Sequence, residues 1–259
     1  MEGTDIPLGL LAPNPRYPRM TMWQLGLTMM RHGRQSLAAD SASFVGALAG
    51  RWTAEGLEYI PQAGPVCLAI NHWQRPGLWI GWSGMLIGWL VWQRRPHADP
   101  PINWLVLTEL RLPFFGRERH LALGDIFLRR VAHAWSMVPL SVGSNMTFKR
   151  AESLRRLRRL ADVGAVIGFF PEGHLGVAGT LGQPRPGATR FLDWLAQSGV
   201  TVVPVGIHEA SNCLHARIGP PLKPDRASGQ HVGGSIEMQI MPEIAAQLPQ
   251  TLRGRWGAT

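Results

Sequence analysis

The chain has 259 residues, of which 45% are hydrophobic and 17% charged, and its formal net charge is +9 at pH 7. This composition is that of a globular protein, and the length allows one large core, or one core with a small appended element. The sequence has no internal repeat and no low-complexity segment, which excludes a repeat architecture.

The positive charge comes almost wholly from arginine, because lysine occurs only at positions 149 and 223. An arginine excess suits either nucleic acid or an anionic lipid surface. Eleven tryptophans and ten methionines favour the lipid surface, since tryptophan suits the membrane–water interface. No nucleic-acid-binding motif accompanies the charge, so we predict a peripheral membrane surface as partner and no nucleic acid.

The two cysteines, Cys67 and Cys213, lie in or near apolar runs, which predicts reduced thiols and no disulfide framework. The N-terminus has no charged n-region, apolar h-region or small-residue cleavage site, so we expect no secretory signal. These observations favour a cytoplasmic protein, peripheral on the inner face of the membrane.

Residues 1–50 form the first predicted unit. Four prolines make residues 1–19 irregular or extended, whereas residues 20–50 follow a helical pattern. A break near Asp40 and Ser41 would divide this pattern into an N-terminal pair of helices. Such a pair either packs on the core or lies on a bilayer.

Two strands, at 52–58 and 66–70, are expected next, and residues 78–92 are the most apolar segment of the chain. That segment is about 15 residues long, whereas a membrane span needs about 20. It predicts a buried or interfacial helix.

Strands alternate with helices in the rest of the chain. We predict strands at 102–109, 137–142, 165–170, 200–207 and 215–218, and helices at 121–135, 147–163, after 187 and at 236–247. The helix at 147–163 has an apolar face and a basic face. This alternation predicts an α/β domain over residues 51–259, with a central, mostly parallel mixed sheet flanked by helices.

Polar side chains follow two of the buried strands. Asn71 and His72 come directly after strand 66–70, and Glu172 and His174 follow strand 165–170. Adjacent parallel strands would bring these ends together in one crevice. A neutral histidine there can act as general base on a hydroxyl nucleophile, and the alternative is a histidine that caps the strand through a backbone bond.

Several motifs in this order resemble the glycerolipid acyltransferase superfamily, whose best-known members are the lysophosphatidate acyltransferases. The resemblance covers about residues 50–256 and implies acyl transfer from acyl-coenzyme A or acyl carrier protein, with the histidine as base. The matching segments are Asn71-His72, Phe170-Pro171-Glu172-Gly173, Val203-Pro204-Val205-Gly206-Ile207, Ile218-Gly219-Pro220-Pro221-Leu222, Leu248-Pro249 and Arg253-Gly254-Arg255-Trp256.

The chain departs from the family pattern at three places. The family places an aspartate five residues after the histidine, where this chain has Gly77. The family continues its Pro-Glu-Gly with threonine or serine and then arginine, whereas His174 and Leu175 stand here. A further family arginine near residues 138–142 is missing as well. The resemblance implies that these arginines bind the phosphate of the acceptor.

Three interpretations remain open. In the first, the protein is an acyltransferase in which Glu172, Asp125 or a backbone carbonyl orients His72, and an acceptor without a phosphate is one option. In the second, it is a degenerate member that binds lipid or acyl chains without turnover. In the third, Arg75 and the arginines of 155–159 replace the lost phosphate ligands.

The predicted site combines these residues. We assign His72 and Glu172 to catalysis and predict no metal and no cofactor, with the acyl thioester as co-substrate and a lipid-like hydroxyl as acceptor. The remaining residues are predicted to bind substrate: Asn71, Arg75, Pro171, Gly173 and His174.

Overall fold

The computed structural model describes residues 35–74, 80–98, 100–107, 111–114, 117–120, 122–140, 147–173, 179–222 and 236–257. Their centre is a seven-stranded sheet in the order β1-β9-β8-β2-β7-β3-β6. Its strands are β1 (Trp52–Glu55), β2 (Val66–Ile70), β3 (Asn103–Leu107), β6 (Val138–Leu140), β7 (Val166–Phe169), β8 (Thr201–Ala210) and β9 (Cys213–Ile218).

Five neighbouring strands, β8, β2, β7, β3 and β6, run parallel, and β9 pairs antiparallel with β8. All residues of β2 and β7 are buried, as continuous apolar runs in a parallel sheet require. The predicted mostly parallel mixed sheet is confirmed.

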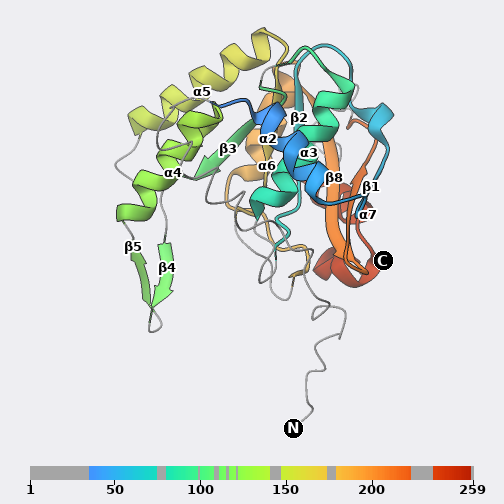
Figure 1. Ribbon diagram of the computed structural model, residues 1–259. Helices are drawn as coiled ribbons and strands as arrows, with labels where there is room; N and C mark the ends of the chain where they lie inside the picture. Colours follow the sequence, from blue (N-terminus) through green and yellow to red (C-terminus); the bar gives the residue numbers. More distant parts are fainter. Residues whose placement is uncertain are drawn as a thin grey trace.

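Helices cover both faces of the sheet (Figure 1). One core cluster joins the sheet to α2 (Leu37–Ala47), α3 (Ile80–Arg94) and α4 (Ala122–Ala134). The other cluster joins it to α5 (Thr147–Asp162), α6 (Ala188–Gln197) and α7 (Ile236–Ala246). Strands β4 (Arg111–Phe114) and β5 (Arg117–His120) form a separate antiparallel hairpin that the sequence patterns did not predict.

The predicted break near Asp40 and Ser41 is wrong, because α2 runs through both residues. Tertiary contacts use their polar groups. The Asp40 carboxylate accepts the Trp135 indole N–H at 2.7 Å, and the Ser41 hydroxyl donates to the sulfur of Met85 at 3.4 Å. The apolar side chains of α2 pack on the core, and residues 1–34 lie outside the described residues.

The strand predicted at 52–58 ends earlier than expected. Gly56 has a φ of 75°, in the left-handed region, and a short 3-10 helix, η2 (Leu57–Tyr59), follows it. A Cβ at Gly56 would collide with the backbone oxygen of Ile218, so the close approach to β9 requires glycine here.

The apolar segment predicted at 78–92 corresponds to α3, which packs against α2 and buries eight of its residues. In the described part of the chain, every helix is too short or too polar to span a membrane.

Candidate active site

Asn71 directly follows β2, and its side chain continues the hydrogen bonding of β2 to β8. Its Nδ2 donates to the backbone oxygen of Ile207 at 2.9 Å, and its Oδ1 accepts the Ile207 N–H at 2.6 Å. The two bonds imitate a pair of strand backbones, and the side chain is only 3% exposed. Asn71 therefore fixes the place where the chain leaves the sheet, immediately before His72. Its predicted contact with substrate stays a prediction.

Glu172 joins the two strand ends, as the sequence predicted, through backbone groups. It lies in the turn after β7, and its side chain is 1% exposed. Its Oε1 accepts the backbone N–H of His72 at 2.6 Å, and its Oε2 accepts the backbone N–H of Gly182 at 2.5 Å. Short bonds from N–H groups to a carboxylate are among the stronger hydrogen bonds in proteins. These bonds hold the peptide group of His72.

The imidazole of His72 packs against the ring of Phe170. Its ring centroid lies 5.5 Å from that of Phe170 in an edge-on arrangement. Phe170 in turn stacks on Trp104 from β3, with centroids 5.1 Å apart and planes inclined by 9°. The sequence patterns did not predict this stack, because β3 and the residue after β7 meet only in the folded sheet.

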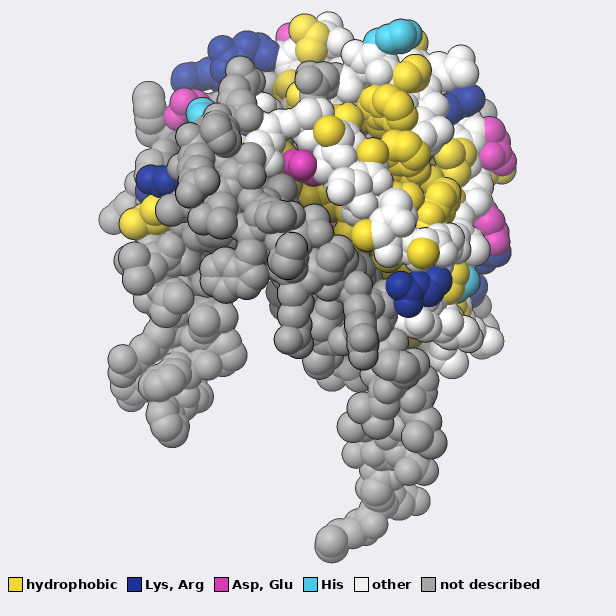
Figure 2. All heavy atoms as spheres, viewed as in Figure 1, with side chains coloured by type: hydrophobic (Ala, Val, Ile, Leu, Met, Phe, Trp, Pro, Cys, Tyr) yellow, Lys and Arg dark blue, Asp and Glu magenta, His cyan; other side chains and the backbone are white. Residues whose placement is uncertain are grey.

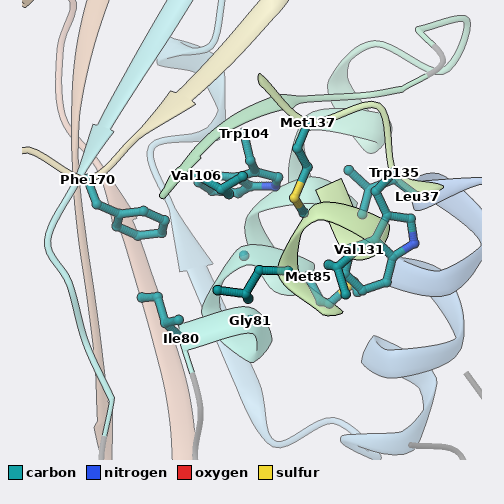
Figure 3. A pocket seen from close by; sticks show the side chains of 12 residues that line it. Leu37, Ile80, Gly81, Met85, Trp104, Val106, Val131, Trp135, Met137 and Phe170 are labelled. Atoms are coloured by element: carbon teal, nitrogen blue, oxygen red, sulfur yellow. The ribbon is translucent and has the colours of Figure 1, made fainter. Parts of the chain in front are cut away.

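Phe170 and Trp104 also form a wall of an apolar cavity of about 100 Å³ (Figure 3). In this view the labelled side chains converge on a hollow between the sheet and α2, α3 and α4. Almost all lining atoms are apolar, and Gly81 and Gly84 of α3 leave space where other residues would project. His72 contacts Phe170, which also lines the apolar cavity, and this arrangement is suited to a reactive polar group attached to a hydrocarbon chain.

Arg185 is a residue of the site that the sequence analysis missed. Its backbone N–H donates to the Pro171 oxygen at 2.9 Å, and a Cβ at Gly173 would lie 2.7 Å from its Cδ and Nε. Gly173, with a φ of 60°, thus makes room for this side chain. Arg185 is exposed and forms no ion pair with any described residue. The only sequence signal was its place in the loop that follows the Pro-Glu-Gly turn.

The roles predicted for four other residues stay predictions. Arg75, Gly77 and His174 lie outside the described residues. Asp125 is buried in the first turn of α4, and its predicted role in orienting His72 stays a prediction.

The arginines of 155–159 belong to α5, whose last turn leads into the amino end of β7. Figure 1 shows α5 along the top of the molecule, and His72 follows the carboxyl end of β2. Because β2 and β7 are parallel, Arg158 and Arg159 lie near the amino ends of these strands, whereas His72 lies at their carboxyl ends. Arg156 donates to the Ser136 oxygen at the end of α4. This position argues against the α5 arginines as replacements for the lost phosphate ligands, whereas the part of the interpretation that rests on Arg75 stays a prediction.

Comparison with known proteins places the crevice in context. The family model described as Acyltransferase matches residues 51–208, a range that includes both His72 and Glu172. A matching solved structure is the 1-acyl-sn-glycerophosphate (LPA) acyltransferase PlsC from Thermotoga maritima, with 15% sequence identity and a TM-score of 0.51. That match covers 98% of this chain and 89% of the PlsC chain, and it shows a shared fold. No curated protein matched the sequence. Because the family model covers more than half of the chain, the protein belongs to the Acyltransferase family.

Proposed function

We propose that the protein transfers a fatty acyl group from acyl-coenzyme A or acyl carrier protein to a hydroxyl of a lipid-like acceptor, with His72 as general base. The observation that carries this proposal is the position of His72. Its backbone is held by buried Glu172 at a strand end, and its ring packs on Phe170, which lines the apolar cavity.

In the proposed reaction, His72 first accepts a proton and then donates it. The neutral imidazole of His72 takes the proton of the acceptor hydroxyl, and the oxygen attacks the thioester carbonyl carbon. The carbon–sulfur bond then breaks, and the leaving thiolate takes the proton from the imidazolium. The cavity beside Phe170 would receive part of the acyl chain, which explains its apolar lining.

The site lacks the family's aspartate, since Gly77 stands at that position. We infer that backbone anchoring by Glu172 and packing on Phe170 restrict the orientation of the His72 ring. A ring restricted in this way needs less rearrangement before proton transfer, although it gains no carboxylate to stabilise the imidazolium.

The acceptor is proposed to carry an anionic group, such as a phosphate ester. Support comes from Arg185, which extends over Gly173, next to Glu172. An exposed guanidinium without an ion-pair partner among the described residues is available to a phosphate through charge-assisted bonds.

We propose that the protein meets the inner face of the membrane as a peripheral protein. Figure 2 shows hydrophobic side chains gathered over α2 and α3. Trp82, Trp89 and Trp92 of α3 are all half-buried, and Trp89 and Trp92 stack at 5.2 Å. Partly exposed tryptophans suit the membrane–water interface.

A second candidate function is binding of lipid or acyl chains without turnover. Gly77 favours it, as does the use of Asn71 and Glu172 on backbone groups.

A panel of hydroxyl acceptors, phosphate-bearing and neutral, incubated with acyl-coenzyme A and acyl carrier protein donors, separates the two candidates. Acylated product formed in step with thiol release supports the transferase. Saturable binding of the acyl chain without product from any acceptor supports the binding protein and overturns our proposal.

A further inference from the structure

Residues near the C-terminus pack on residues 181 and 182, and the Gly182 N–H binds Glu172. Residues 250–257, which we call the C-terminal clasp, contain the 3-10 helices η4 (Gln250–Leu252) and η5 (Gly254–Gly257). The Leu252 oxygen accepts the N–H of Leu181 at 2.8 Å, and the Trp256 indole N–H donates to the Gly182 oxygen at 3.2 Å. The clasp thus contacts two successive residues of the loop.

The peptide bond between Leu181 and Gly182 connects the clasp to Glu172. The Leu181 oxygen and the Gly182 N–H belong to one planar peptide group. Gly254 packs against that oxygen, since a Cβ at Gly254 would lie 2.6 Å from it. The N–H at the other side of the same plane donates to Oε2 of Glu172 at 2.5 Å. Rotation of this peptide plane would therefore break the bond to Glu172.

We propose that the C-terminal clasp positions His72, and that Trp256 is a positioning residue which acts through Gly182 and Glu172. The bonds form one series: Trp256 to the Gly182 oxygen, the Gly182 N–H to Glu172, and the His72 N–H to the other oxygen of Glu172. Glu172 is buried, so losing the Gly182 donor weakens the hydrogen bonding that fixes the position of its carboxylate. A shift of the carboxylate moves the peptide group of His72.

The proposed link between the clasp and the backbone of His72 can be tested without any substrate. Amide hydrogen exchange, read by NMR, reports the opening of the His72 and Gly182 N–H groups. In the wild-type protein we expect these two groups and the Trp256 indole to open with the same free energy, because they belong to one unit. Independent opening of the His72 N–H, at a free energy well below that of the Trp256 indole, would overturn the proposal.

The variant Trp256→Phe keeps an aromatic ring and removes the donor. We expect exchange at the His72 amide to rise about three- to tenfold, the loss expected for one hydrogen bond. The matched control is Arg255→Ala, which removes the cation lying 5.1 Å above the Trp256 ring and keeps the indole N–H. Equal exchange at His72 in both variants would contradict the proposal.

The catalytic consequence rests on the proposed acyl transfer. There we expect Trp256→Phe to lower kcat with little change in KM for the acyl donor, because His72 is displaced while the cavity is kept. If His72 exchange rises in the variant but the wild-type protein transfers no acyl group, the clasp is established and the proposed function fails. If the wild-type protein is active and the variant has unchanged His72 exchange and unchanged kcat, the clasp proposal is overturned and the proposed function is kept.

Discussion

Two polar side chains of the site, those of Asn71 and Glu172, form hydrogen bonds with backbone groups of the protein. Asn71 satisfies both backbone groups of Ile207, and Glu172 accepts N–H groups from His72 and Gly182. A sequence motif cannot distinguish a carboxylate that orients an imidazole from one that holds a peptide group, since both need a buried acid beside the histidine. The distinction depends on which atoms meet after folding.

Replacing Glu172 by glutamine should destabilise the protein by about 1–3 kcal/mol, because an amide NH2 would face one of the two backbone N–H donors. Chemical denaturation measures this loss. Glu58→Gln, at an exposed position, is the matched control. A Glu172→Gln protein as stable as the control would show that the two bonds contribute nothing.

Arg185→Met tests the proposed anionic acceptor. We expect KM for a phosphate-bearing acceptor to rise about tenfold or more, with KM for a neutral acceptor unchanged, because only the first loses a charged partner. Steady-state kinetics with both acceptors measure the effect, and Arg155→Met, an exposed arginine on α5, serves as control. Equal changes for the two acceptors would contradict a role in phosphate binding.

His208 predicts a pH dependence of stability. Burial, then the nearby charges of His215 and Arg217, lower the pKa of His208 to about 4 from 6.5. Between pH 6.5 and 4, His208 therefore binds a proton in the unfolded chain but not in the folded protein. The contribution of neutral His208 to stability is present above pH 6.5 and is lost as the pH falls toward 4. The loss is at most about 1.4 kcal/mol per pH unit.

Denaturation curves between pH 4 and 7 measure the His208 contribution. His208→Leu should flatten the decline in stability, whereas His97→Leu, at an exposed position, should keep it. An equally steep decline without His208 would show that other groups cause it.

At the scale of elements, the continuous apolar runs identified the parallel strands correctly, because a strand buried on both faces has no polar alternation. The polar pair Asp40-Ser41 was misleading, since its partners Trp135 and Met85 are far away in the sequence. The stack of Phe170 on Trp104 was missed for the same reason. Local patterns indicate which face is buried, and they contain no information on which distant side chain occupies it.

The cavity between α3 and the sheet gives a prediction for chain length. A Cβ at Gly84 would touch the Trp104 ring at 3.6 Å without a clash, so Gly84→Val should fold and fill part of the hollow. We expect the rate with long-chain thioesters to fall about tenfold or more relative to short-chain ones. Gly46→Val, in the last turn of α2 with open space around it, is the control for placing a valine in a helix. Unchanged chain-length preference would exclude the cavity as the acyl site.

At the scale of the whole molecule, the order of strands and helices predicted the fold class, and the family model and the PlsC structure agree with it. The arrangement that holds His72 was less predictable. It depends on β2, the turn after β7, the loop at 181–182 and the end of the chain, which come together only through the sheet and the clasp.

The most direct test of this account is acyl transfer by the wild-type protein and by His72→Ala, measured as thiol release matched to acylated acceptor. His133→Ala, an exposed histidine of α4, is the control, and thermal unfolding confirms that each variant folds. We expect the control to keep the wild-type rate and His72→Ala to lose at least about 100-fold, the contribution of a general base. A His72→Ala rate within a few-fold of the wild type would contradict the central role of His72.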